Sequence, residues 1–191
     1  DTVAQGTALA VSVLGNLESA TLWQLSRQDD DGTPLGRSAL TAWTNAGACL
    51  HRSLALLWRA VQQVQRGGPP TATKLRTLLF SKGSTPPAET HLEGESYGAV
   101  FALMQAAELL GLAIPSDVAC TGAVSADGTI RGVMGVRQKT AAIVLGVPRV
   151  TRLFVPLADL AAAEEGLASC QDAERLSIIG VKTVGALLDA V

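Results

Sequence analysis

The sequence predicts a mixed α/β fold, in which helices pack against mixed β-sheets in one domain that spans residues 1–191. Apolar runs of strand length are bounded by Gly, Pro or Asn, and they alternate with segments whose apolar residues recur at helical spacing. Hydrophobic residues make up 48% of the chain and charged residues 17%. This composition excludes a disordered chain and predicts a large core or a subunit interface.

The N-terminal third is expected to form a hairpin and a long helix. Residues 7–14 and 20–25 have strand composition and are joined by a Gly-Asn turn, whereas 28–36 is a polar loop. A helix is predicted over 38–65, where Leu and Trp recur near a helical period. The Asn-Ala-Gly sequence at 45–47 weakens the middle of this helix, where we expect a kink or a break.

The central part is expected to contain three short strands and a buried helix. Residues 75–80 have the length of a strand, and 81–94 form an exposed loop rich in Ser, Gly and Pro. A helix over 97–110 is apolar nearly all round and too short to span a membrane, so it should lie in the core. Residues 119–124 and 129–133 are predicted to pair as a hairpin across an Ala-Asp-Gly turn.

The C-terminal part alternates helices and strands. A helix is expected over 136–145, a parallel strand over 151–155 and an alanine-rich helix over 157–167. Residues 178–184 and 184–191 make one more strand and helix. No interior linker is long enough to require a second domain.

Charge and cysteine content limit the partners and the compartment. Fifteen basic and seventeen acidic side chains give a net charge of −2 and a pI near 5.7, which argues against a nucleic-acid partner. Cys49, Cys120 and Cys170 are too few and too scattered for a disulfide framework, which fits a reducing, cytoplasmic location. The chain begins at Asp1 without a methionine, as an excised fragment or a processed product would, and no segment predicts a membrane span.

Metal and phosphate chemistry are not expected. The only histidines, His51 and His91, lie far apart, no CxxC or HExxH motif is present, and His91 is expected to be a solvated loop residue. Residues 132–140 (GVMGVRQKT) distantly resemble a phosphate-binding loop, but Gln138 replaces the glycine before the lysine. We therefore expect no metal and no cofactor.

Ser96 and Lys139 are the two candidates for catalysis, and each has a structural alternative. Ser96 precedes the buried helix, where serine is a common N-cap, but a helix start can also stabilise an oxyanion beside a nucleophilic serine. Lys139 lies near the start of an apolar helix, from which its amine could extend to solvent. If buried instead, the amine would have a lowered pKa and could deprotonate a serine.

Three collinear segments resemble the proteolytic domain of Lon-type proteases. Residues 93–99 (EGESYGA) resemble the nucleophile motif of that family, and 116–124 (SDVACTGAV) resemble its D-V-A-M-T-G-E-I segment. Residues 127–142 (DGTIRGVMGVRQKTAA) resemble its block around the catalytic lysine. The order is that of the family, and the resemblance covers residues 75–191, the expected catalytic core, whereas 1–74 are divergent.

The resemblance implies a serine endopeptidase, a hydrolase in which Ser96 is the nucleophile, Lys139 the general base and Thr121 a hydroxyl that orients the lysine amine. Main-chain groups of Glu93, Gly94 and Glu95 would form the oxyanion and substrate-binding region. It further implies a protein or peptide substrate, a homo-oligomer, and an ATPase module elsewhere in the parent protein or complex. An extended substrate is expected beside residues 75–80.

The chain departs from the family pattern around these residues. Glu95 replaces the proline before the serine, Glu93 an aspartate, Ala123 a glutamate and Met134 a glycine. None of these changes removes a catalytic group, but they bear on substrate preference and ring assembly. Two other functions are a non-catalytic scaffold of Lon-like fold and a protease that processes its own polyprotein.

Overall fold

A computed structural model describes residues 8–13, 20–27, 36–53, 73–78, 94–111 and 113–191. The chain forms a mixed α/β structure, as the sequence predicts. Its strands are β1 (Ala8–Val13), β2 (Ala20–Arg27), β3 (Thr73–Leu78), β4 (Val118–Cys120), β5 (Ala123–Val124), β6 (Ile130–Arg131), β7 (Arg152–Pro156) and β8 (Ser177–Val181). The α-helices among the described residues are α1 (Arg37–Ser53), α3 (Gly98–Leu110), α4 (Val136–Gly146), α5 (Leu160–Ala168) and α6 (Val184–Ala190). Three 3₁₀ turns are η1 (Glu95–Tyr97), η2 (Leu157–Asp159) and η3 (Ala173–Arg175).

Six strands form one mixed sheet in the order β3-β2-β1-β4-β7-β8. The predicted N-terminal hairpin is confirmed, because β1 and β2 pair antiparallel, and β2 pairs antiparallel with β3. From β1 to β8 the neighbouring strands are parallel, which also confirms the parallel strand expected near 151–155. Strands from both ends of the chain therefore lie in one sheet. The division of the chain into a divergent part (1–74) and a catalytic core (75–191) stays a prediction.

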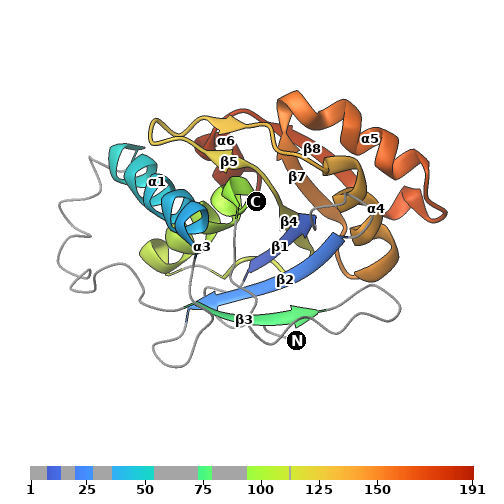
Figure 1. Cartoon of the computed structure of the whole chain (residues 1–191), viewed down its shortest axis with the longest axis horizontal. Helices are drawn as coiled ribbons and strands as arrows, with labels where there is room; N and C mark the ends of the chain where they lie inside the picture. Colours follow the sequence, from blue (N-terminus) through green and yellow to red (C-terminus); the bar gives the residue numbers. More distant parts are fainter. Residues whose placement is uncertain (1–7, 14–19, 28–35, 54–72, 79–93, 112) are drawn as a thin grey trace.

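Helices cover both faces of this sheet (Figure 1). Alternation along the central strands separates two cores: Cys120 and Phe154 pack with α1, α3 and α6, whereas Ala119 and Leu153 pack with α4 and α5. The predicted burial of α3 is confirmed, since its residues from Gly98 to Met104 are all buried.

Helix α1 runs through residues 45–47 without a break, so the expected break is wrong. Gly47 instead serves packing, because a Cβ there would lie 2.9 Å from Gln105 Oε1 on α3. The Gln105 Nε2 donates to the Trp43 carbonyl at 3.0 Å, and the Trp43 ring meets Phe101 edge to face. The predicted continuation of this helix to 65 lies outside the described residues. Three other predicted segments also lie outside them: the turn of the N-terminal hairpin (14–19) and the loops over 28–35 and 81–93.

The single strand expected over 119–124 is wrong, because the chain leaves the large sheet at Thr121. Strand β4 ends at Cys120, and β5 pairs instead with β6 in a separate two-stranded sheet. Gly122 makes the turn with a φ of 152°, and a Cβ at this position would lie 2.7 Å from Ile130 Cγ2. This turn places Thr121 at the carboxyl end of a parallel strand.

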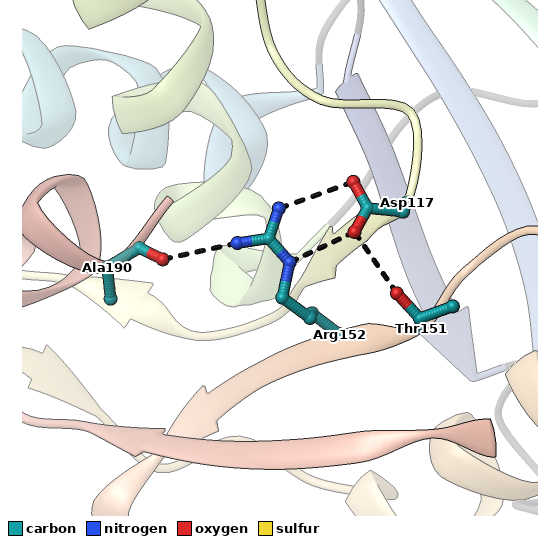
Figure 2. A network of polar contacts seen from close by, with 4 residues as sticks. All are labelled: Asp117, Thr151, Arg152 and Ala190. Carbon is teal, nitrogen blue, oxygen red and sulfur yellow. Dashed lines mark hydrogen bonds and ion pairs between the residues drawn. The ribbon is translucent and has the colours of Figure 1, made fainter.

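The amino ends of β4 and β7 are joined by a polar network (Figure 2). Arg152 donates to Asp117 from Nε at 3.0 Å and from Nη2 at 3.3 Å, and Thr151 Oγ1 donates to the same carboxylate at 3.1 Å. The Arg152 Nη1 also donates to the Ala190 carbonyl at the end of α6. These bonds hold the pKa of Asp117 below its usual value, chiefly through the Arg152 hydrogen bonds.

Arg175 closes the C-terminal end of α4. Its guanidinium donates to the carbonyls of Ile143 and Val144 at the end of the helix. The same group donates to three carbonyls of the following loop, those of Val147, Pro148 and Val150. A cation at this end of a helix also interacts favourably with the helix dipole.

We expect Arg175→Ala to lower the free energy of unfolding by about 2 kcal/mol, because several carbonyls lose a charged donor. Arg175→Lys should recover only part of the loss, since one ammonium group cannot span carbonyls that a planar guanidinium reaches. Urea denaturation measures both effects. Arg149→Ala, which alters an exposed arginine nearby, is the control, and an equal loss in both alanine variants would contradict the assignment.

Candidate functional site

Ser96 lies in η1, the 3₁₀ turn that leads into α3. Tyr97 is the N-cap residue of α3, and no side chain caps either helix start, so the structural alternative for Ser96, an N-cap, is wrong. The Ser96 hydroxyl forms no hydrogen bond with another described residue. Its carbonyl, in contrast, accepts from the Gly122 amide at 3.0 Å. The serine is therefore fixed through its main chain while its hydroxyl has no bond within the described part.

The close packing of η1 on the turn after β4 depends on Gly98. A Cβ at Gly98 would lie 2.6 Å from the Val124 amide nitrogen on β5. The Ala99 amide donates to the Gly122 carbonyl at 3.0 Å, which adds a second main-chain bond between the same two segments. The glycine in the Ser-Tyr-Gly sequence thus allows the serine turn to contact the segment that carries Thr121.

Lys139 is buried inside the molecule, with 2% of its surface exposed. It lies in the first turn of α4, which begins after Gly135. Its Nζ donates to Thr121 Oγ1 at 3.0 Å, so the interpretation that the amine extends to solvent is wrong. No ion pair joins Lys139 to a carboxylate within the described residues.

Thr121 connects the lysine to the serine turn. Its Oγ1 accepts from Lys139 Nζ and donates to the Ser96 carbonyl at 3.4 Å. The Thr121 amide donates to the Phe154 carbonyl at 3.0 Å, which anchors the residue to β7. The structure therefore brings the three sequence-predicted catalytic residues together at one end of β4. No hydrogen bond joins Ser96 directly to Lys139 in this arrangement.

Burial lowers the pKa of Lys139 to about 8, because desolvation disfavours the charged form of the amine. The Asp159 carboxylate acts in the opposite direction and favours the charged form. A substantial fraction of the amine is therefore neutral in mildly alkaline solution. A neutral amine has a lone pair that can accept a proton from a nearby hydroxyl.

The residues predicted to form the oxyanion and substrate-binding region differ in their hydrogen bonds. The Gly94 amide donates to Ser38 Oγ at 2.7 Å, so this N–H is already engaged, and the part of Gly94 in the oxyanion and substrate-binding region stays a prediction. The Glu95 side chain accepts from Arg131 Nη2 at 3.0 Å in a half-exposed ion pair. The amides of Glu95 and Ser96 open the 3₁₀ turn, where the first N–H groups have no partner within the helix. Glu93 lies outside the described residues.

Asp159 was missed by the sequence analysis. It ends η2, three residues after β7, and its Oδ2 accepts from the Val133 amide at 2.8 Å. The position of polar groups after neighbouring parallel strands could have indicated it, because the carboxyl ends of such strands meet at one edge of a sheet. The Arg131 and Ser38 contacts had no comparable signal in the sequence.

Other kinds of site find no support in the described part of the chain. No group of three or more His, Cys, Asp or Glu side chains there is arranged to hold a metal ion. Among the same residues, no helix has the length and apolar character required to cross a bilayer. Cys49, Cys120 and Cys170 are free thiols, and burial raises the pKa of Cys49 to about 11.

A scan against protein-family models and a search of curated protein sequences each find no match to this chain. We therefore infer the function from the residues and their geometry.

We expect wild-type stability to rise by about 3 kcal/mol between pH 8 and pH 10.5 through Lys139, because in this window the unfolded chain binds a proton that the folded amine does not. Lys139→Met should lack this contribution. The stability of this variant minus that of wild type should therefore be larger at neutral pH than above pH 10.5. Urea denaturation across the window measures the difference. Lys182→Met removes an exposed lysine and should retain the rise; loss of the rise in that variant would contradict the prediction.

We expect Thr121→Val to destabilise the fold by about 1–3 kcal/mol, since it leaves a buried amine without its hydrogen-bond acceptor. Thr121→Ser retains the hydroxyl and should lose much less. In a Lys139→Met background the cost of Thr121→Val should shrink, which a double-mutant cycle detects. Equal costs in both backgrounds would show that the hydroxyl does not serve the lysine.

Proposed function

We propose that this chain is a serine endopeptidase of Lon-like fold, in which Ser96 and Lys139 form the catalytic pair. The observation that carries the proposal is the buried Lys139 amine, which has a pKa near 8, no ion pair in the described part, and a hydrogen bond to the threonine that contacts the serine turn. Structural lysines are normally exposed or paired with carboxylates. An unpaired buried amine beside a serine is the arrangement that a general base without histidine requires.

Thr121 determines how the lysine amine is used. Because the hydroxyl accepts from Lys139 Nζ and donates to the Ser96 carbonyl, the donor and acceptor roles at Thr121 are both filled. The neutral amine donates one N–H to Thr121, and its lone pair is available to accept from another hydroxyl. The lone pair can then accept the Ser96 proton once the serine side chain turns toward it.

The reaction follows from this geometry. Lys139 takes the proton of the Ser96 hydroxyl as the serine oxygen attacks the peptide carbonyl, which gives a tetrahedral oxyanion and an ammonium group. The ammonium returns the proton to the leaving amine as the C–N bond breaks, leaving an acyl-enzyme. The neutral lysine then takes a proton from a water molecule, whose oxygen attacks the ester carbonyl. As the ester C–O bond breaks, the ammonium returns this proton to the Ser96 oxygen, which restores the hydroxyl and the neutral amine.

The amides at the start of η1 are the donors that would stabilise the oxyanion. Glu95 and Ser96 supply N–H groups at the beginning of a turn that continues into α3, so the helix dipole adds partial positive charge there. Gly94 is not among these donors, because Ser38 occupies its amide.

The proposed function also includes the substrate, the associated module, the oligomeric state and the location of the protein. The substrate would be a protein or peptide, and the parent protein or complex would include an ATPase module and several copies of this chain in the cytoplasm. A non-catalytic scaffold remains the competing function, and the covalent labelling below separates the two.

We expect Ser96→Ala and Lys139→Ala each to lower peptide cleavage by on the order of 10³-fold or more while the fold is kept. A serine-directed covalent probe should add one mass increment to wild type, none to Ser96→Ala and far less to Lys139→Ala. Ser125→Ala, which changes a partly buried serine of the nearby hairpin, is the matched control and should label normally. Labelling that survives Ser96→Ala, or a wild type that is never labelled, would contradict the proposal and favour a scaffold.

Cleavage should increase with pH around a midpoint near 8, because the base must be neutral to accept the serine proton. The measurement is kcat/KM for a peptide substrate from pH 6 to 9.5. A rate that falls between pH 7 and pH 9, in protein that circular dichroism shows to be folded, would exclude lysine as the base.

A further inference from the structure

Asp159 connects the end of β7 to the beginning of the helix that carries Lys139. Its Oδ2 accepts from the Val133 amide at 2.8 Å, within the segment that precedes α4. A Cβ at Gly132 would lie 3.0 Å from Asp159 Oδ1, so this main chain passes directly against the carboxylate. The two contacts fix the segment from which α4 starts, three residues before the helix and six before the lysine.

Asp159 is also the charged group that acts on Lys139. Its field favours the ammonium form, against the larger effect of desolvation. The other charged groups on neighbouring elements lie at the surface: Glu164 and Glu165 on α5 are exposed, and Glu165 lies 4.0 Å from Arg137 on α4. Glu95 on η1 pairs with Arg131 on β6. Among the strands that α4 covers, β1 has no ionisable residue, and β2 has only Arg27, at its end.

We infer that Asp159 is a positioning residue of the Ser96–Lys139 pair, which holds the Gly132–Val133 main chain ahead of α4 and supplies the negative charge that acts on the buried amine. Its use in catalysis rests on the proposed function, whereas its effect on the lysine does not. In this arrangement one carboxylate both locates the base and limits how far desolvation can deprotonate it. The acidic limit of activity would then depend on Asp159 as well as on burial.

Two substitutions at Asp159 separate the charge from the hydrogen bond. Asp159→Asn removes the charge but retains a carbonyl oxygen that can accept from the Val133 amide. Asp159→Ala removes both. Glu165→Gln makes the same change of charge on the adjacent helix and is the matched control.

The protonation of Lys139 can be followed without substrate. The chain contains four lysines, so a sample labelled with ¹³C at the lysine Cε position gives few signals, and the one lost in Lys139→Met identifies Lys139. We expect the titration midpoint of this signal to move to lower pH in Asp159→Asn and to stay near the wild-type value in Glu165→Gln. Amide hydrogen exchange at Val133 should remain slow in Asp159→Asn and become faster in Asp159→Ala.

An unchanged Lys139 midpoint in folded Asp159→Asn would overturn the role of the charge, and unchanged Val133 exchange in Asp159→Ala would overturn the role of the hydrogen bond. If the Asp159 variants do not fold, Gly132→Ala tests the same contact, because its Cβ would lie 3.0 Å from Asp159 Oδ1 and the carboxylate must move by a few tenths of an ångström away from the Val133 amide. Faster Val133 exchange in this variant supports the role of the hydrogen bond, and unchanged exchange overturns it. The lower limb of the pH–activity profile should shift with the midpoint. Because the titration needs no substrate, it tests the effect of Asp159 on Lys139 even if the chain does not cleave peptides.

Discussion

A lysine amine removed from water, with no ion pair to a carboxylate in the described part of the chain, is the constraint around which this molecule is arranged. Among the residues whose burial the structure describes, Lys139 is the one buried Lys, Arg, Asp or Glu side chain. The close packing of α5 on α4 helps to exclude water, since a Cβ at Gly166 would lie 2.3 Å from the Arg137 carbonyl oxygen. Burial without an ion pair carries a cost in stability. Such a cost is typical of a functional group rather than of a structural one.

The two members of the proposed catalytic pair approach from opposite faces of the sheet. Ser96 precedes α3, which packs in the core with α1 and α6, whereas Lys139 lies on α4 in the other core. Both are hydrogen-bonded to Thr121 beyond the carboxyl end of β4, where the chain leaves the sheet. The turn at Gly122 is therefore as important for the site as the reactive groups, because it lets one hydroxyl contact both the lysine and the serine main chain.

The helix that carries Lys139 is held at both ends. Asp159 fixes the main chain before α4, and Arg175 binds the carbonyls at its end and in the loop beyond. Both anchors come from segments that follow β7 in the chain. A few directed hydrogen bonds at the helix ends, together with packing on α5, keep the amine in position while the serine hydroxyl stays without a bond in the described part.

The sequence alone determined the fold class, most strands and helices, and the choice of Ser96, Lys139 and Thr121, because hydrophobic period, turn residues and collinear motifs are local properties. It could not separate Ser96 from an N-cap or Lys139 from a solvent-reaching lysine, since burial and hydrogen bonds depend on elements distant in the chain. Only the tertiary structure showed that residues 119–124 are divided between two sheets and that the Gly94 amide donates to Ser38. It also showed that Asp159 accepts a hydrogen bond from the segment that precedes α4. Each of these contacts joins segments that no local pattern relates, and the desolvation that lowers the pKa of Lys139 exists only once they have packed.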